Sequence, residues 1–268
     1  MTGRRATIQS VERAARILKA LGTGAPRLGV TEIADRLGIA KATVYGLVRT
    51  LEQQELVEQD AETGKYRLGP AMLQLGNAFL EHHELRSRSL LWADSLASRV
   101  GEAVRVGVLH GRTVLIVHHV FRPDDTVQVL EVGAAIPWHA SALGKAAAAF
   151  LDADRRRTLL AGALPRLTGR TIAHPHELAG VLDRAALDGV AREDQEAVLG
   201  EAGIAAPIFD HRGHPVGAIG VVGPADRLHP GVPAEEIVAA VKDAARGVSR
   251  EMGAGRLASR GVEPAGPR

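Results

Sequence analysis

The chain has 268 residues, of which 46% are hydrophobic and 24% charged, a formal net charge of +2 and no cysteine. The lack of cysteine excludes disulfides, thiolate metal sites and cysteine nucleophiles, and no apolar run approaches the roughly 20 residues of a membrane-spanning helix. No apolar signal segment follows Arg4 and Arg5, so we expect a cytoplasmic protein. A helical module of about 70 residues leaves enough chain for a second domain.

Three short amphipathic helices are predicted in the first fifty residues. The first covers residues 9–21, and its apolar face is formed by Val11, Ala14, Leu18 and Leu21. The second begins at Thr31, a candidate N-cap, and stops at Gly38. The third begins at Ala40 or Lys41, and its inward face is formed by Val44, Leu47, Val48 and Leu51. Two short helices joined by a tight turn are typical of a helix-turn-helix.

The outward face of the third helix suggests a nucleic-acid surface. It carries cations, hydroxyls and one aromatic ring, from Lys41, Ala42, Thr43, Tyr45, Arg49 and Thr50. Such groups can contact phosphates and base edges, although an ordinary helical hairpin with a solvated face gives a similar pattern. The local charge favours DNA binding over a merely solvated face. Residues 1–49 hold nine Lys and Arg, among them Arg4 and Arg5 in an N-terminal arm, against three Asp and Glu.

Two short strand-like runs, residues 55–59 and 65–68, flank a turn at Gly64. They predict a hairpin wing that presents Lys65 to DNA and completes a winged helix-turn-helix over residues 8–69. Only 3% of the residues are aromatic, which argues against a stacking surface for single strands and favours duplex DNA.

A further helix is expected to link two domains. Gly69 and Pro70 start it, because Pro is favoured in a first helical turn, and it extends through residues 70–84. Its apolar face is formed by Met72, Leu75, Phe79 and Leu80. This face can pack on the second domain, or it can pair subunits into a homodimer or a dimer of dimers, as an inverted-repeat DNA site requires.

Residues 85–253 predict an α+β domain with a largely antiparallel sheet. Helices are expected at 85–100, 142–151, 152–187 and 233–252, and strands at 103–109, 113–121, 128–132, 204–209 and 216–222. Such a sheet needs cover on one face and can leave a pocket on the other. Residues 254–268 are rich in Gly and Pro and predict a disordered tail.

Enzyme motifs fail at specific positions. In the stretch from Ser141 to Lys145, a P-loop would need Gly at His139 and Ser or Thr at Ala146. A nucleophile elbow would need Gly at His139 and Leu143. We therefore expect no catalytic residues and no cofactor, although a small-molecule enzyme with secondary DNA binding, or an architectural DNA binder without a ligand, remains an alternative.

The histidines and the recurring glycines give no clear ligand signal. Only His118 or His119 can point into a core, as alternate residues of a strand, and HEXXH is absent, so no metal site is expected. Gly217, Gly220 and Gly223 recur at a spacing of three, which is not a dinucleotide-binding pattern and instead indicates close packing.

Together these stretches resemble the IclR family of bacterial transcriptional regulators. The resemblance rests on residues 10–18, the helix pair and 63–69 in the first domain, and on 139–146, 193–196, Gly200, 205–210 and 217–224 in the second. It implies a DNA-binding regulator with a GAF-like effector-binding domain. Residues 107–110, 117–125 and 129–133 are most similar to the glycerol-operon branch of the family in actinomycetes, which implies a repressor of glycerol or related carbon catabolism.

The resemblance also implies an effector site. Members that bind 2-oxo acids use backbone amides at a helix start, an Asp, a Cys and two Ser; the matching positions here lie beside Ser141 and are Ala142, Leu143, Glu193, Gly203, Gly220 and Val222. Since the Cys and both Ser are absent, a 2-oxo acid is not expected, and the glycines are expected to leave room. Glu193 could accept hydroxyls of glycerol or glycerol 3-phosphate, or merely cap or solvate a surface loop.

Overall fold

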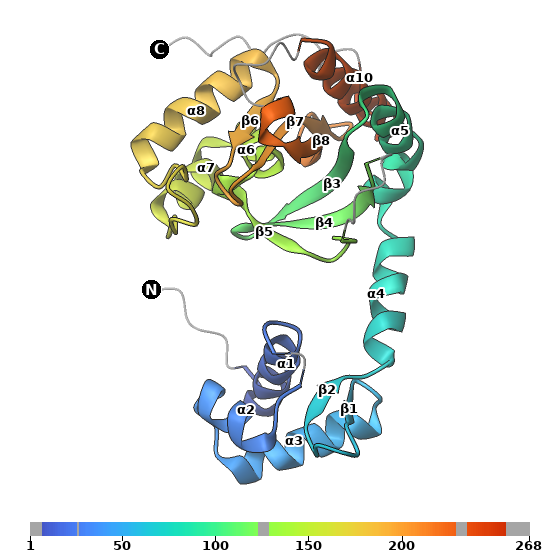
Figure 1. Ribbon diagram of the computed structural model, residues 1–268, viewed down its shortest axis with the longest axis vertical. Helices are drawn as coiled ribbons and strands as arrows, with labels where there is room; N and C mark the ends of the chain where they lie inside the picture. The colour runs from blue at the N-terminus through green and yellow to red at the C-terminus, as the bar shows by residue number, and fades with distance from the viewer. Residues whose placement is uncertain (1–6, 26, 123–128, 229–234, 256–268) are drawn as a thin grey trace. The chain divides into compact units, whose positions relative to one another are not determined.

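The computed structural model describes residues 7–25, 27–122, 129–228 and 235–255. The chain divides into two compact units, Met1–His82 (unit 1) and His83–Arg268 (unit 2), each described here by itself (Figure 1). Arg4, Arg5 and most of the predicted tail lie outside the described residues. No described helix is long and apolar enough to cross a bilayer.

Unit 1 has the predicted winged helix-turn-helix fold. Its helices are α1 (Gln9–Leu21), α2 (Val30–Leu37) and α3 (Lys41–Gln53), and its wing is the antiparallel pair β1 (Val57–Gln59) and β2 (Tyr66–Leu68). Ile17, Ile33, Val44 and Val48 are fully buried in one shared core. Gly38 ends α2 with a φ of 64°, the left-handed conformation that glycine adopts without strain.

Two details of unit 1 differ from the prediction. Val11 is 64% exposed, whereas Ile17 and Ala20 are buried; the second half of α1, rather than its first turn, therefore packs into the core. Thr31 is not the N-cap, because α2 begins at Val30. The free N–H of Gly29 instead donates to Glu32 Oε2 at 2.6 Å, so a glutamate in the first turn reaches back to satisfy an end group that has no helical partner.

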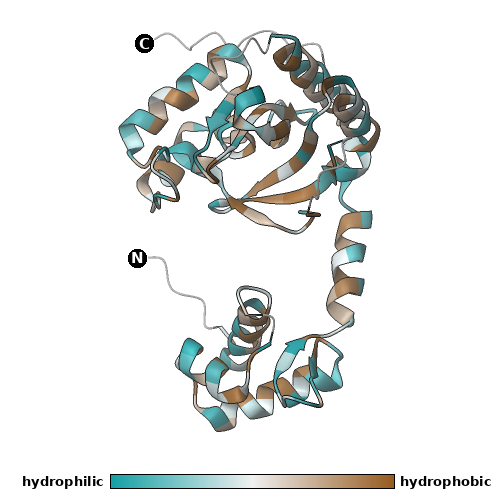
Figure 2. Cartoon of the chain, viewed as in Figure 1, coloured by the Kyte–Doolittle hydropathy of each residue, from teal (hydrophilic) through white to brown (hydrophobic). Residues whose placement is uncertain are grey.

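Helix α4 (Ala71–Glu81) follows the wing and has no buried residue. Pro70 directly precedes its first helical residue. Leu73, Leu75 and Phe79 are 69%, 60% and 51% exposed, and Figure 2 shows hydrophobic turns along this helix. Met72, by contrast, is half-buried.

Unit 2 is built on a six-stranded antiparallel sheet in the order β5-β4-β3-β8-β7-β6. The strands are β3 (Ala103–His110), β4 (Thr113–Val120), β5 (Ala135–Pro137), β6 (Ala191–Asp194), β7 (Glu201–Phe209) and β8 (Pro215–Pro224). This confirms the expected α+β class. Helices α5 (Glu84–Val100) and α10 (Glu235–Glu251) cover one face (Figure 1).

The other face of the sheet carries α6 (Ala142–Ala148), whose residues are all buried, and α8 (Pro175–Asp188) packs against α6. The helix α7 (Ala153–Ala161), the 3-10 turn η1 (Trp138–Ala140) and the short α9 (Ala225–Leu228) complete the unit. A Cβ on Gly144 would lie 2.5 Å from Trp138 Cα, so α6 can start this close to η1 only with glycine there.

Two strand predictions in unit 2 need correction. Residues 129–132 are not a strand, and Gln128 lies outside the described residues; the edge strand that pairs with β4 is β5 instead. The N–H of Glu131 donates to His119 Nδ1 at 3.2 Å, so this segment is held by side-chain contacts rather than by a strand ladder. The short charged strand β6, which carries Glu193, was not predicted.

Candidate functional site

The outward face of α3 is the first candidate site. Lys41, Ala42, Tyr45, Arg49 and Thr50 are exposed and Thr43 is half-buried, while the opposite face of the helix enters the core. The guanidinium of Arg49 lies 5.9 Å from the Tyr45 ring centroid, which holds the cation over the ring. The helix therefore presents two cations, two hydroxyl side chains and one aromatic ring on adjoining turns.

The wing residue Lys65 is exposed but already paired. Its Nζ lies 3.0 Å from Glu32 Oε1. The Gly29 N–H and the Lys65 ammonium both hold the pKa of Glu32 below its ordinary value. A phosphate that binds Lys65 would have to compete with this exposed ion pair, which is a weak competitor in water.

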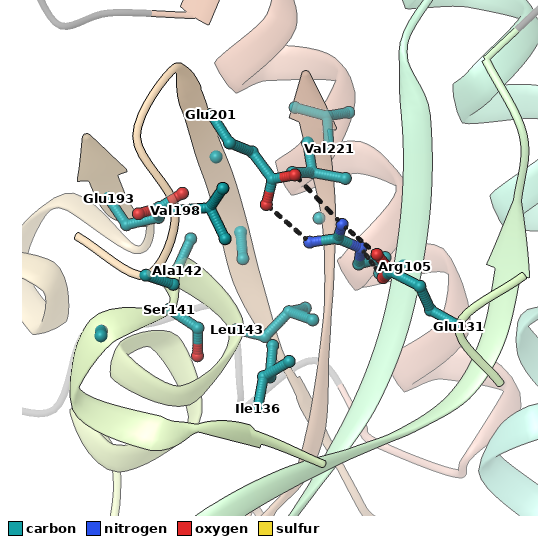
Figure 3. Close-up of a pocket in the computed structure, with 16 residues that line it drawn as sticks. Arg105, Glu131, Ile136, Ser141, Ala142, Leu143, Glu193, Val198, Glu201 and Val221 are labelled. Carbon is teal, nitrogen blue, oxygen red and sulfur yellow. Dashed lines mark hydrogen bonds and ion pairs between the residues drawn. The ribbon is translucent and has the colours of Figure 1, made fainter. Parts of the chain in front are cut away.

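The second candidate site is a pocket of about 120 Å³ in unit 2, on the α6 side of the sheet (Figure 3). The structure brings together around it the six positions matched by resemblance and the adjacent Ser141: Ser141, Ala142, Leu143, Glu193, Gly203, Gly220 and Val222. They come from the start of α6 and from three neighbouring strands, which explains how positions far apart in the sequence converge. Ile136, Leu143, Val198 and Val222 supply apolar walls.

An ion-pair cluster in the pocket was missed by sequence reasoning. Arg105 of β3 is only 13% exposed at its side chain, and its Nη1 donates to Glu201 Oε1 at 3.1 Å. Its Nη2 donates to Glu131 Oε1 at 2.7 Å, and its Nε also contacts Glu131. One guanidinium therefore binds two carboxylates from separate segments. Val104 and Val106 point to the opposite face of the sheet, so in the sequence Arg105 has the pattern of an ordinary solvent-facing cation and no local signal marked it as a pocket residue.

Glu193 lies across the pocket from Arg105, and only 6% of its surface is exposed. Burial raises its pKa to about 7, against an opposing hydrogen bond from the Glu196 N–H to Oε2 at 3.1 Å. Near neutral pH a large share of the Glu193 carboxyl is therefore protonated, and in that form it can donate a hydrogen bond as well as accept one. The expectation of an acceptor alone holds only for the ionised form. By accepting the Glu196 N–H, Glu193 also caps the loop that follows β6, which was the alternative role expected for it. The carboxyl is buried, however, and does not lie on a surface loop.

The residues of the enzyme-like motifs have structural contacts. Ser141 Oγ accepts from the Gly144 N–H at 3.1 Å and caps α6. Lys145 is completely buried, pairs with Glu196 and donates to Arg192 O at 3.3 Å. Within the described ranges, no group of three potential metal ligands occurs. His119 is buried, and its pKa falls to about 4 because of burial and the nearby Arg105.

The pocket glycines do not leave the room that was expected. A Cβ on Gly220 would lie 2.5 Å from Ile204 O, and one on Gly203 would lie 3.2 Å from Val221 O. A Cβ on Gly217 would lie 2.6 Å from Gly107 O. These glycines allow neighbouring strands and helices to approach closely, which confirms the packing interpretation of the Gly217 and Gly220 spacing.

Comparisons with known proteins agree with both units. Residues 10–61 match the IclR helix-turn-helix domain, and residues 77–250 match the C-terminal domain of the bacterial transcriptional regulator IclR. The glycerol operon regulatory proteins of Streptomyces griseus and Streptomyces coelicolor are 50% and 49% identical to this chain over 251 and 259 residues, and each match covers 93% of this chain and 98% of the relative.

A solved structure agrees with the fold. The crystal structure of an IclR transcriptional regulator from Alicyclobacillus acidocaldarius is similar with a TM-score of 0.81 and 27% sequence identity, covering 92% of this chain and 100% of the other. The family matches cover most of the chain, and the helix-turn-helix bears an exposed cationic face. The chain therefore belongs to the IclR family of DNA-binding transcriptional regulators.

Proposed function

We propose that this regulator represses a glycerol or related carbon-catabolism operon and that a small metabolite in the unit 2 pocket changes its affinity for operator DNA. The names of two relatives about half identical to it over 93% of the chain support the pathway. The observation that carries the regulatory part is the partly open, charge-bearing pocket in a unit separate from the helix-turn-helix.

Operator contacts are proposed for the outward face of α3 and for the wing. Lys41, Arg49 and Lys65 would neutralise phosphates, while Tyr45 and Thr50, with Ala42 and Thr43, would lie against the groove. The same role is proposed for Arg4 and Arg5, by analogy with basic arms that follow a DNA groove. Exposure of the α3 side chains supports this assignment.

Subunit pairing is proposed for α4. Three large apolar side chains of this helix keep more than half of their surface exposed, from Leu73, Leu75 and Phe79, and half-buried Met72 adjoins them. Covering such a face against a second copy would remove apolar surface from water. A two-fold dimer, or a dimer of dimers, would also suit an operator with two half-sites.

The proposed effector is glycerol or glycerol 3-phosphate. Apolar walls would cover its carbon chain, and Glu193, Arg105 and Glu201 offer acceptors and donors for its oxygen atoms. Ala142 and Leu143 stand in the first turn of α6, where backbone N–H groups have no helical acceptor. The pocket no longer carries the thiol and hydroxyls that 2-oxo acids use in related proteins.

The test combines Glu193→Ala with a DNA duplex selected from a random-sequence library. The variant should bind the duplex as the wild type does, because Glu193 lies in unit 2, while glycerol or glycerol 3-phosphate should alter the affinity of the wild type alone. Fluorescence anisotropy measures both. Calorimetry in which glyoxylate binds more tightly than glycerol and glycerol 3-phosphate, or in which the variant binds them unchanged, would contradict the assignment.

A further inference from the structure

The charges around the pocket are unequal. Of its sixteen lining residues, all of which the structure describes, one is a cation, Arg105, and three are carboxylic acids, Glu131, Glu193 and Glu201. A ligand therefore meets more acidic than basic groups. An anionic ligand could be neutralised in this pocket only by the guanidinium of Arg105.

Arg105 is occupied on both edges of its guanidinium. Nη1 and Nη2 lie 3.1 and 3.4 Å from the two oxygens of Glu201, and Nη2 and Nε contact Glu131. Figure 3 shows the group between these two carboxylates. An anion could bind Arg105 only by displacing one of them, which would leave a carboxylate in a mostly buried site without its counter-ion, a costly arrangement.

A neutral hydroxyl group can bind without displacing Glu131 or Glu201 from Arg105. It can donate to a carboxylate oxygen and accept from a guanidinium N–H while both ion pairs persist. Across the pocket, Glu193 has a pKa raised to about 7 by burial, so its carboxyl can donate to or accept from a hydroxyl. The lining thus offers hydrogen bonds at two ends of the pocket, with apolar side chains between them.

We propose that the pocket selects an uncharged polyol and rejects the corresponding phosphate ester, because Glu131 and Glu201 occupy both edges of Arg105. Glu131 and Glu201 are then the residues that set ligand charge. This inference rests on the proposed effector role of the pocket and narrows its ligand class to neutral polyhydroxyl compounds.

The test is calorimetry of the full chain with glycerol and with glycerol 3-phosphate, at one pH and ionic strength. The wild type should bind glycerol at least about tenfold more tightly than the phosphate ester, a difference of about 1.4 kcal/mol or more. Glu201→Gln should free one edge of Arg105 and strengthen binding of the ester by about tenfold. Glu131→Gln frees the other edge and should act in the same direction.

The matched control is Glu236→Gln, which removes a carboxylate from the exposed first turn of α10; it should keep the wild-type preference. Equal or tighter binding of the ester by the wild type would overturn the charge selection while leaving the pocket as a sensor. Unchanged ester binding in both folded pocket variants would also overturn it. Binding of neither compound would remove both this inference and the proposed effector.

Discussion

Glu193→Gln should make the stability of unit 2 less dependent on pH. The folded protein raises the pKa of Glu193 to about 7 from an ordinary 4.5 because the carboxyl is buried. Its contribution to stability is therefore fully present below pH 4.5, where folded and unfolded chains both carry the proton. It is lost as the pH rises through 7, since the folded chain must then release a proton that it holds tightly.

The magnitude follows from the two pKa values. A tenfold change in proton affinity is about 1.4 kcal/mol, so the full difference is about 3 kcal/mol, and about 2 kcal/mol of it falls between pH 5 and pH 8. Glutamine keeps the size of the side chain and an oxygen that can accept from the Glu196 N–H, but it does not titrate. Relative to the wild type, the variant should gain about 2 kcal/mol over this range.

Tryptophan fluorescence is the assay. Both tryptophans of the chain, Trp92 and Trp138, lie in unit 2, and Trp138 is fully buried. Denaturant unfolding of the full chain at fixed concentration therefore reports on this unit. The control Glu236→Gln changes an exposed carboxylate and should follow the wild-type pH dependence. If Glu193→Gln and the wild type kept a constant difference in unfolding free energy from pH 5 to 8, the carboxyl would be ionised with an ordinary pKa and the reasoning would be wrong.

The remaining predictions concern the other surfaces. Arg49→Ala and Lys41→Ala should each weaken operator binding and flatten the plot of log affinity against log salt by about one, with effector affinity kept; unchanged slopes in both would place the DNA surface elsewhere. Phe79→Asp should yield monomers in ultracentrifugation, whereas Leu187→Asp, at an exposed position of α8, should not; an unaltered assembly in the Phe79 variant would exclude α4 from the interface. Lys145→Met should lower the free energy of unfolding by about 3–5 kcal/mol, because it leaves the buried carboxylate of Glu196 without its cation. A loss below about 1 kcal/mol in denaturant unfolding would mean that this ion pair contributes little.

Local patterns predicted most of the elements. The spacing of apolar residues located α2 and α3, and Gly38 and Gly101 end their helices in the left-handed conformation. Such signals depend on neighbours within a few residues of each other. The strand β6 lacked them, since four residues with three charged side chains give no apolar alternation.

The pocket was predicted only in part, for a related reason. Family motifs pointed to the start of α6 and to Glu193, but the partners of Arg105 lie 26 and 96 residues away along the chain. The sheet order brings Glu201 of β7 to Arg105, and Glu131 comes from the segment before β5, which is not a strand. The raised pKa of Glu193 likewise results from burial by distant segments, which no local pattern records.

If the regulator senses a metabolite, ligand binding in the pocket and DNA binding at α3 must be coupled. This coupling can be measured from the affinity of the full chain for glycerol, determined once with the protein free and once with it saturated by its selected operator duplex. Because linkage is reciprocal, the ratio of the two ligand affinities must equal the ratio of operator affinities with and without ligand. Both ratios should depart from one by the same factor, and Glu193→Ala should abolish the effect. Tight glycerol binding with both ratios equal to one would contradict this coupling.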